Sequence, residues 1–300
     1  MIEPSLTFTK LVQSIHEGTF QLESLAQSFR DIEQANEKFE NLFEDIDLYA
    51  KKLGNTPQKQ NKTISEVMKQ LNDLNVSGHA GDILGDAYEY LIGQFASDSG
   101  KKAGEFYTPQ AVSHLMTQIV FAGREHQKGM SVYDPTMGSG SLLLNAKRYS
   151  KEASTISYYG QELITSTFNL ARMNMMLHGV AIENYHLSNH DTLDEDWPTT
   201  EPTDFDGVLM NPPYSLKWSA DSGFLQDPRF SSYGVLAPTL TLTTSFTMRA
   251  VLTLSAMQLS QAISRKMPML LSKGLGGAAL NKQAERKITE GFSSLRACVY

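Results

Sequence analysis

The chain has 300 residues, of which 41% are hydrophobic, which is enough for the core of one large domain or of two ordinary ones. It has no apolar run of about 18 residues or more and no charged-plus-apolar N-terminal signal, so we expect a cytoplasmic protein without membrane contact. The single cysteine, Cys298, excludes a disulfide framework and a cysteine-based zinc cluster, and the scattered histidines favour a protein without a bound metal.

The balance of charges limits what the chain binds alone. Its formal net charge is −7, and it contains no strong basic run. A protein that binds DNA alone normally presents a basic face, because neutralisation of phosphates supplies most of the non-specific affinity. The charge therefore disfavours tight DNA binding by this chain without a partner.

Residues 1–98 are predicted to form an α-helical N-terminal domain. Two groups of apolar residues recur at helical spacing: Leu42, Phe43, Ile46 and Tyr49, and then Ile64, Val67, Met68, Leu71 and Leu74. Thr63 and Glu66 have the spacing of a capping box, which predicts that the second helix begins near Thr63. Such stripes usually form a helical core rather than a binding site. Residues 97–104 are predicted to be a linker.

Strand-like and helix-like patterns alternate from about residue 105, which predicts an α/β domain with a mostly parallel sheet over residues 99–238. The alternation opens with Glu105, Phe106, Tyr107, Thr108, Pro109 and Gln110. Thr108 as N-cap and Pro109 as first helical residue predict a helix start. The apolar face of this helix is predicted to carry Val112, Leu115, Met116 and Ile119. The segment is either simply a well-capped helix start or a place where Phe106 and Tyr107 pack on a cofactor.

A strand at Met130–Asp134 is predicted to run into a glycine-rich turn and then a helix. The turn contains Gly138, Ser139, Gly140 and Ser141. This succession is the cofactor-binding geometry of open α/β sheets, in which the ligand lies outside the carboxyl ends of the strands. The turn matches neither the dinucleotide fingerprint nor a phosphate-binding loop. Asp134 would repel a pyrophosphate but attract an ammonium group, which favours S-adenosylmethionine as the cofactor.

Two further acids follow strand-like runs in chain order. Residues 156–162 are predicted to form a second strand that ends in Glu162, whose carboxylate can accept both hydroxyls of a ribose. Thr165 is predicted to cap the next helix. Residues 185–189 are predicted to form a third strand, and Asp191 after it could hold the adenine amino group of the cofactor. Each acid alone is more often a solvated loop residue, but their order favours a cofactor site.

A fourth strand at Asp206–Met210 is predicted to lead into Asn211, Pro212, Pro213 and Tyr214. The Asn211 side-chain oxygen and the Pro212 carbonyl are two acceptors for a planar amino group, and Pro212 has no competing N–H. Tyr214 offers a flat face on which a base can stack. Asn-Pro-Pro is also an ordinary turn signal. The motifs upstream favour the catalytic interpretation, in which an exocyclic amine is held and methylated.

Taken in order, these motifs resemble the amino-methylating DNA methyltransferases, specifically the modification subunit of type I restriction–modification systems. The resemblance covers roughly residues 60–237, and its motif order is that of the class that makes N6-methyladenine. It implies a Rossmann-like S-adenosylmethionine-dependent methyltransferase sheet preceded by an α-helical N-terminal domain. It implies that residues 105–110, residues 139–141 and Glu162 contact S-adenosylmethionine. It also implies that Asn211 and Tyr214 handle the target adenine.

The resemblance further implies partner subunits. A separate specificity subunit would recognise double-stranded DNA, a second modification subunit would flank it, and a restriction subunit would complete the system. This arrangement is compatible with the net charge of −7. In the family, the N-terminal helical domain helps to assemble the complex and to surround DNA.

Residues 239–300 differ in composition from the rest of the chain. They contain two acids, Glu285 and Glu290, against eight lysines or arginines, and they show no clear strand–helix alternation. The resemblance implies a further helix and the closing strands of the sheet here. Either this tail is divergent and still folds, or the reading frame shifts near Thr239. We favour the shifted frame, which would leave the sheet incomplete and the chain inactive or poorly folded.

Two other functions fit parts of the pattern. Methylation of a protein glutamine amide also uses Asn-Pro-Pro-Tyr on a planar amino group, although residues 105–109 and Asp134 favour DNA as the substrate. A non-catalytic remnant that binds the cofactor or partner subunits would fit the abnormal tail.

Overall fold

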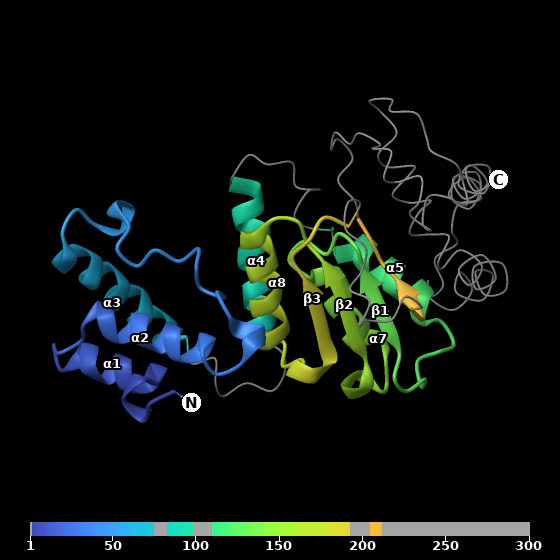
Figure 1. Cartoon of the computed structure of the whole chain (residues 1–300), viewed down its shortest axis with the longest axis horizontal. Coiled ribbons are helices and arrows are strands. Elements are labelled where there is room, and N and C mark those ends of the chain that lie inside the picture. Colours follow the sequence, from blue (N-terminus) through green and yellow to red (C-terminus); the bar gives the residue numbers. More distant parts are fainter. Residues whose placement is uncertain (1, 75–82, 99–107, 109, 193–204, 212–300) are drawn as a thin grey trace.

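The structure is a computed structural model that describes residues 2–74, 83–98, 108, 110–192 and 205–211 (Figure 1). Helices α1–α3 lie to one side, the sheet lies to the other, and α4 and α8 stand between them. In this part of the chain, no helix is long and apolar enough to cross a membrane. The predictions for residues 239–300 lie outside the described residues.

The N-terminal side consists of helices joined by short 3-10 turns. The helices are α1 (Phe8–His16), α2 (Leu22–Glu33) and α3 (Pro57–Asp73), and the turns are η1 (Pro4–Leu6), η2 (Glu37–Phe39) and η3 (Lys51–Leu53). Their buried apolar side chains form one cluster of Leu11, Val12, Ile15, Phe20 and Met68. The predicted helical character is therefore confirmed for most of this region.

Helix α3 begins earlier than the capping-box spacing predicts. Its N-cap is Thr56, whose side-chain oxygen accepts from the N–H of Lys59 at 3.3 Å, and Pro57 is the first helical residue. Thr63 lies inside the helix, where its hydroxyl donates to the carbonyl of Leu53 at 2.8 Å. The predicted start at Thr63 is wrong, because a Thr-Pro pair upstream supplies a stronger start signal.

The first apolar stripe does not form a helix. Residues 40–50 form turns and irregular backbone. Phe43 stacks on Phe29 with ring centroids 4.3 Å apart, whereas Ile46 is exposed. Asn41 takes a left-handed backbone conformation with φ 56°, which interrupts a helical path. Apolar residues at helical spacing here belong to turns, in which Phe43 contacts Phe29.

The sheet has four parallel strands, β1 (Ser131–Asp134), β2 (Ser157–Gln161), β3 (Tyr185–Ser188) and β4 (Gly207–Val208). Their order is β3-β2-β1-β4, so the chain moves outward from β1 to β3 and then returns to the other side of β1. The predicted α/β fold with a parallel sheet is confirmed. The order reverses between β1 and β4, and open parallel sheets bind their ligands at such a point.

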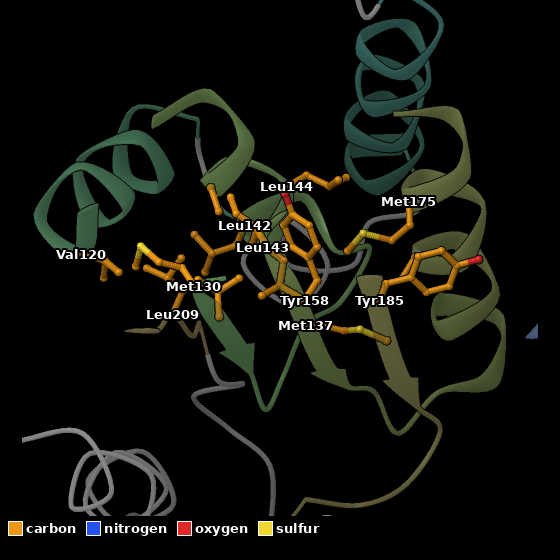
Figure 2. Packing of buried hydrophobic residues seen from close by; sticks show 14 of the residues in the cluster. Val120, Met130, Met137, Leu142, Leu143, Leu144, Tyr158, Met175, Tyr185 and Leu209 are labelled. Carbon is orange, nitrogen blue, oxygen red and sulfur yellow. The ribbon is translucent and has the colours of Figure 1, made fainter. Parts of the chain in front are cut away.

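The helices that accompany the sheet are α4 (Ile83–Asp98), α5 (Gln110–Phe121), α6 (Ser141–Leu144), α7 (Ala146–Tyr149) and α8 (Thr165–Leu177), with the short turns η6 (Ala153–Thr155) and η7 (Ile182–Asn184). The core lies between these helices and the sheet, where Tyr158 and Tyr185 of the strands meet Leu143 and Met175 of the helices (Figure 2). Helix α4 includes residues 97 and 98 of the predicted linker, and residues 99–104 lie outside the described residues.

Helix α5 turns a different face to the core from the one predicted. Ser113 and Thr117 are buried, whereas Val112 is 48% and Leu115 is 58% exposed. Asn145, which follows α6, donates from Nδ2 to Oγ of Ser113 at 2.5 Å. The predicted face is wrong for Val112 and Leu115, whereas its Met116 packs against the core, and the buried side of the helix carries the polar contact of Ser113.

The N-terminal side meets the sheet region at a turn formed by residues 38–45. Arg172 of α8 is buried and donates from Nη1 to the carbonyls of Glu40 at 2.8 Å and Lys38 at 3.2 Å. Asn169 of the same helix donates to the same turn. Several hydrogen bonds thus cross the joint between the two regions, and Leu42 of the same turn is fully buried.

Candidate functional site

The carboxyl edge of the sheet collects the predicted site residues. Asp134 ends β1, Glu162 directly follows β2, Asp191 follows β3 and Asn211 follows β4. Because the four strands are parallel, their carboxyl ends lie at one edge. The topology thus brings together side chains that are far apart in the sequence.

The glycine-rich turn after β1 follows a path that requires glycine. Gly138 and Gly140 have positive φ angles of 55° and 78°, which residues with side chains rarely adopt. Gly140 also lies against α8, since a Cβ added to it would stand 3.3 Å from Cε of Met175. The N–H of Gly140 donates to the carbonyl of Met137 at 2.8 Å. The backbone of this turn is therefore held close to α8.

The two serines of the turn are buried with it. Ser139 is 2% and Ser141 is 5% exposed, and their hydroxyl oxygens lie 3.1 Å apart. Both therefore contribute to the internal order of the turn.

Glu162 joins the glycine-rich turn to the start of α8. Its Oε2 accepts from the N–H of Gly138 at 3.1 Å, and its Oε1 accepts from the N–H of Ile164 at 2.8 Å. Burial raises the pKa of Glu162, and the backbone hydrogen bonds oppose that rise. Thr165 is the first residue of α8 rather than its N-cap, which is Ile164, so the predicted cap is one residue too late.

Asp134 is a buried carboxyl, with 1% of its surface exposed. Its Oδ1 accepts from the N–H of Thr136 at 2.9 Å. Burial raises the pKa of Asp134 to about 7; the hydrogen bonds from Thr136 oppose the rise, and the nearby Glu162 adds to it. A positively charged ligand would restore the ionised form, so this carboxyl suits an ammonium group.

The loop after β3 is hydrogen-bonded to the loops that follow β2 and β1. Asn189 donates from Nδ2 to two successive carbonyls, those of Glu162 at 2.7 Å and Leu163 at 3.1 Å. Thr192 donates from Oγ1 to the carbonyl of the proline that follows β1, at 2.5 Å. Asp191 is half-buried between these two residues. Asn189 and Thr192 were not among the predicted site residues, although both flank the predicted site residue Asp191.

Asn211 lies at the point where the strand order reverses. Backbone pairing holds β4 to β1, and the N–H of Leu209 donates to the carbonyl of Tyr133 at 2.9 Å. Asn211 is half-buried just beyond that pairing, beside the end of β1 that carries Asp134. Pro212 and Tyr214 lie outside the described residues.

The predicted segment before α5 is described only in part. Helix α5 begins at Gln110, directly after the predicted cap and proline at positions 108 and 109. Gln110 donates from Nε2 to Oε2 of the buried Glu89 on α4 at 3.1 Å. Thr108 is half-buried. The residues of this segment outside the described part are Glu105, Phe106, Tyr107 and Pro109.

The arrangement offers carboxyl oxygens beside a glycine-rich turn. Among the described residues, no three His, Cys, Asp or Glu side chains group as metal ligands. Two carboxyls with raised pKa values instead lie around a turn of glycine and serine. Carboxylates can accept from hydroxyl and ammonium groups, and a glycine backbone permits close approach.

Residues 79–258 match the sequence model of a family described as N-6 DNA methylase. The chain belongs to this family. The match contains every site residue predicted from Glu105 to Tyr214 and extends beyond residue 238, where the composition changes.

The chain is also similar to methylase subunits of type I restriction enzymes. The chain is 35% identical over 274 residues to the methylase subunit of the type I restriction enzyme MpnII of Mycoplasma pneumoniae, covering 83% of this chain and 50% of the relative. It is 32% identical over 161 residues to the methylase subunit of the type I restriction enzyme HindI of Haemophilus influenzae, covering 52% of this chain and 34% of the relative.

A solved structure agrees with the fold. The methyltransferase subunit of a type I restriction–modification system from Streptococcus thermophilus is 68% identical and superposes with a TM-score of 0.78. The superposition covers 83% of this chain and 53% of that one. The chain thus has the α/β fold of a methyltransferase subunit, and it spans about half the length of the first relatives that it matches.

Proposed function

We propose that the protein transfers a methyl group from S-adenosylmethionine to N6 of adenine in DNA, as the modification subunit of a type I restriction–modification complex. The observation that carries this proposal is the ordered set of side chains at one sheet edge: Asp134, Glu162, Asp191 and Asn211. The membership of the N-6 DNA methylase family favours adenine in DNA over the glutamine amide of a protein.

The residues at the edge fit the cofactor. Glu162 would accept the two ribose hydroxyls, Asp191 would accept from the adenine amino group of the cofactor, and Asp134 with the turn at residues 138–141 would receive the amino-acid end. In its ionised form, the Asp134 carboxylate would accept hydrogen bonds from the ammonium group at that end. When bound, S-adenosylmethionine supplies an electrophilic methyl group on a sulfonium.

The acceptor side is assigned to Asn211 and the residues after it. The target adenine leaves the duplex, because its amino group cannot be approached in line inside the base stack. The Asn211 side chain and the Pro212 carbonyl accept hydrogen bonds from the N6 amino group, and Tyr214 stacks on the base. These contacts orient the nitrogen lone pair, so catalysis rests on positioning and electrostatics.

The partners follow from the charge and the family. With a net charge of −7, the chain would reach DNA through a separate specificity subunit. A second modification subunit and a restriction subunit complete the proposed cytoplasmic complex. The relatives named above are methylase subunits of type I restriction enzymes, which supports this assembly.

The test uses the protein assembled with its specificity subunit. The unmodified complex should place labelled methyl groups on N6 of adenine, and Asn211→Ala should lower this rate by about 10²–10³-fold because a transition-state contact is removed. Binding of S-adenosylmethionine, measured by calorimetry, should be unchanged.

A matched control is Asn184→Ala, which removes a half-buried asparagine from η7 at the opposite, amino edge of the sheet. It should leave methylation unchanged. Full methylation by Asn211→Ala would refute the assignment of the catalytic side chain. Cofactor binding without methylation by the unmodified complex would favour a non-catalytic remnant.

A further inference from the structure

Helix α8 carries one buried asparagine that faces the glycine-rich turn. Asn174 has 0% exposure and lies on the same side of the helix as Ala171 and Met175, which stand against Gly140. Its Nδ2 donates to the carbonyl of Ser139 at 3.0 Å. The amino group must face Ser139, because a carbonyl oxygen accepts only from a donor.

This asparagine is costly as a packing residue. Its Oδ1 has no hydrogen-bond partner among the described residues, and burying an unsatisfied acceptor costs free energy. An apolar side chain, such as the similarly branched leucine, would fill the space without that cost. The hydrogen bond to Ser139 is therefore the property of Asn174 that packing alone does not explain.

The contact fixes both ends of one peptide group. The Ser139 carbonyl accepts from Asn174, and the N–H of the next residue, Gly140, donates to the carbonyl of Met137 at 2.8 Å. This peptide joins Ser139 to Gly140, and the glycine lets the backbone take other angles at little cost. Without the donor, the Ser139 carbonyl would be a buried acceptor lacking a partner, and the peptide could rotate to find one.

We propose that Asn174 is a positioning residue that holds the glycine-rich turn in the shape that binds S-adenosylmethionine. The proposal rests on the function proposed above, since it concerns the same cofactor turn. The same turn also contains the Gly138 N–H, which donates to Glu162, the carboxylate assigned to the ribose, so the shape of the turn bears on that carboxylate too. Asn174 acts by preorganisation, which lowers the entropy lost on binding.

The test compares variants of one helix in the full chain assembled with its specificity subunit. Asn174→Ala and Asn174→Leu remove the donor, and Asn174→Leu also keeps the space filled. The control is Asn169→Ala, because Asn169 is likewise a buried asparagine of α8, but it donates to the carbonyl of Asn41 and to Asp45 instead. The probes are calorimetric binding of S-adenosylhomocysteine, the KM for S-adenosylmethionine, kcat and thermal unfolding.

Both Asn174 variants should weaken binding by about 10- to 100-fold, the loss expected for a buried hydrogen bond to a binding loop. They should raise KM more than they lower kcat, and amide exchange at Gly138 and Gly140 should become faster. Asn169→Ala should change binding by less than about twofold, even where it lowers the melting temperature as much.

Each other outcome overturns a distinct statement. Unchanged binding by Asn174→Leu would overturn the positioning role and leave the proposed function intact. Equal weakening by Asn169→Ala would mean that any loosening of α8 has the effect, and would also overturn the specific role of Asn174. Failure of the unmodified complex to bind either compound would overturn the proposed function, and this proposal with it.

Discussion

The N-terminal helices and the sheet differ in how much apolar surface they bury. The main core takes residues from β1–β3 and α5–α8 (Figure 2), whereas the core of helices α1–α3 is a smaller cluster around Phe20. In α3, Val67 is 47% and Leu71 is 49% exposed, and Leu74 directly after the helix is 64% exposed. Since apolar burial is the dominant favourable term in folding, we infer that the sheet region is the more stable of the two.

The joint between the two regions differs from both cores. Lys38 donates from Nζ to the carbonyls of Ile182 and Tyr185, each at 2.7 Å, and lies 5.1 Å from the centre of the Tyr185 ring. Arg172 donates in the opposite direction, from α8 to the turn that holds Lys38. We expect loss of these hydrogen bonds to loosen the N-terminal helices before the cofactor edge.

The largest expected effect comes from shortening one methionine in each core. Met175 is 0% and Met68 is 5% exposed. Each change to alanine should cost about 2–5 kcal/mol of unfolding free energy, because it removes buried atoms and leaves a cavity. The cost of Met175→Ala should fall on the sheet, and that of Met68→Ala on helices α1–α3. Hydrogen exchange measured against denaturant, with separate peptides from β2 and from α1, checks this.

Met175→Ala should also weaken cofactor binding, because Met175 stands against Gly140. Met68→Ala should leave cofactor binding unchanged. If the two regions unfold in one shared transition in both variants, the chain is a single cooperative unit, and the inference that the sheet region is the more stable of the two is wrong.

A smaller effect is expected at the joint. Arg172→Ala should cost about 1–3 kcal/mol, because it leaves the carbonyls of Lys38 and Glu40 without this donor in a partly buried place. Hydrogen exchange should become faster in α2 and in residues 38–45 while the strands stay protected. The control is Arg148→Ala, whose ion pair with Asp86 at 2.6 Å is exposed and should contribute only about 0–1 kcal/mol. Equal effects of the two changes would contradict the view of the joint as a buried polar contact.

The strands and the edge could be predicted from the sequence. Short apolar runs that end in an acid or asparagine before a turn have few other interpretations, and β1 and β3 lie within a residue of their predicted bounds. Parallel pairing then brings Asp134, Glu162 and Asn211 to one edge without further information. The roles assigned to these side chains remain predictions.

The buried polar contacts could not be predicted in the same way. Serine and asparagine are usually solvent-facing, yet Ser113 and Asn174 are buried, and each has a hydrogen-bond partner distant in the sequence, Asn145 for the first and Ser139 for the second. The rotation of α5 was missed for that reason. For Asn174 the only local signal is its place beside Met175 on the apolar face of a predicted helix.

The pH dependence of stability probes the sheet edge alone. The folded pKa of Asp134 is about 7, well above the value of about 3.9 expected in the unfolded chain. Between these values the folded state keeps a proton that the unfolded state has lost, so stability falls as pH rises from about 4 to about 7 and then levels. Asp134→Asn should remove this fall, which amounts to about 2–3 kcal/mol between pH 5 and pH 8. Urea unfolding at several pH values measures it, and an unchanged slope would contradict the buried acid as its source.

The smallest effect is expected on the surface of the N-terminal helices. Lys62 and Glu66 lie one turn apart on α3, with 3.8 Å between Nζ and Oε1 and with side chains 78% and 60% exposed. Lys62→Ala should change stability by less than about 0.5 kcal/mol, because a solvated pair is weak and alanine favours the helix. Thermal unfolding at low and high salt checks this. A clear loss of stability at low salt only would mean that surface ion pairs, rather than the cluster around Phe20, stabilise these helices. The N-terminal helices and the sheet would then differ in the kind of interaction that holds them, and not only in the amount of buried apolar surface.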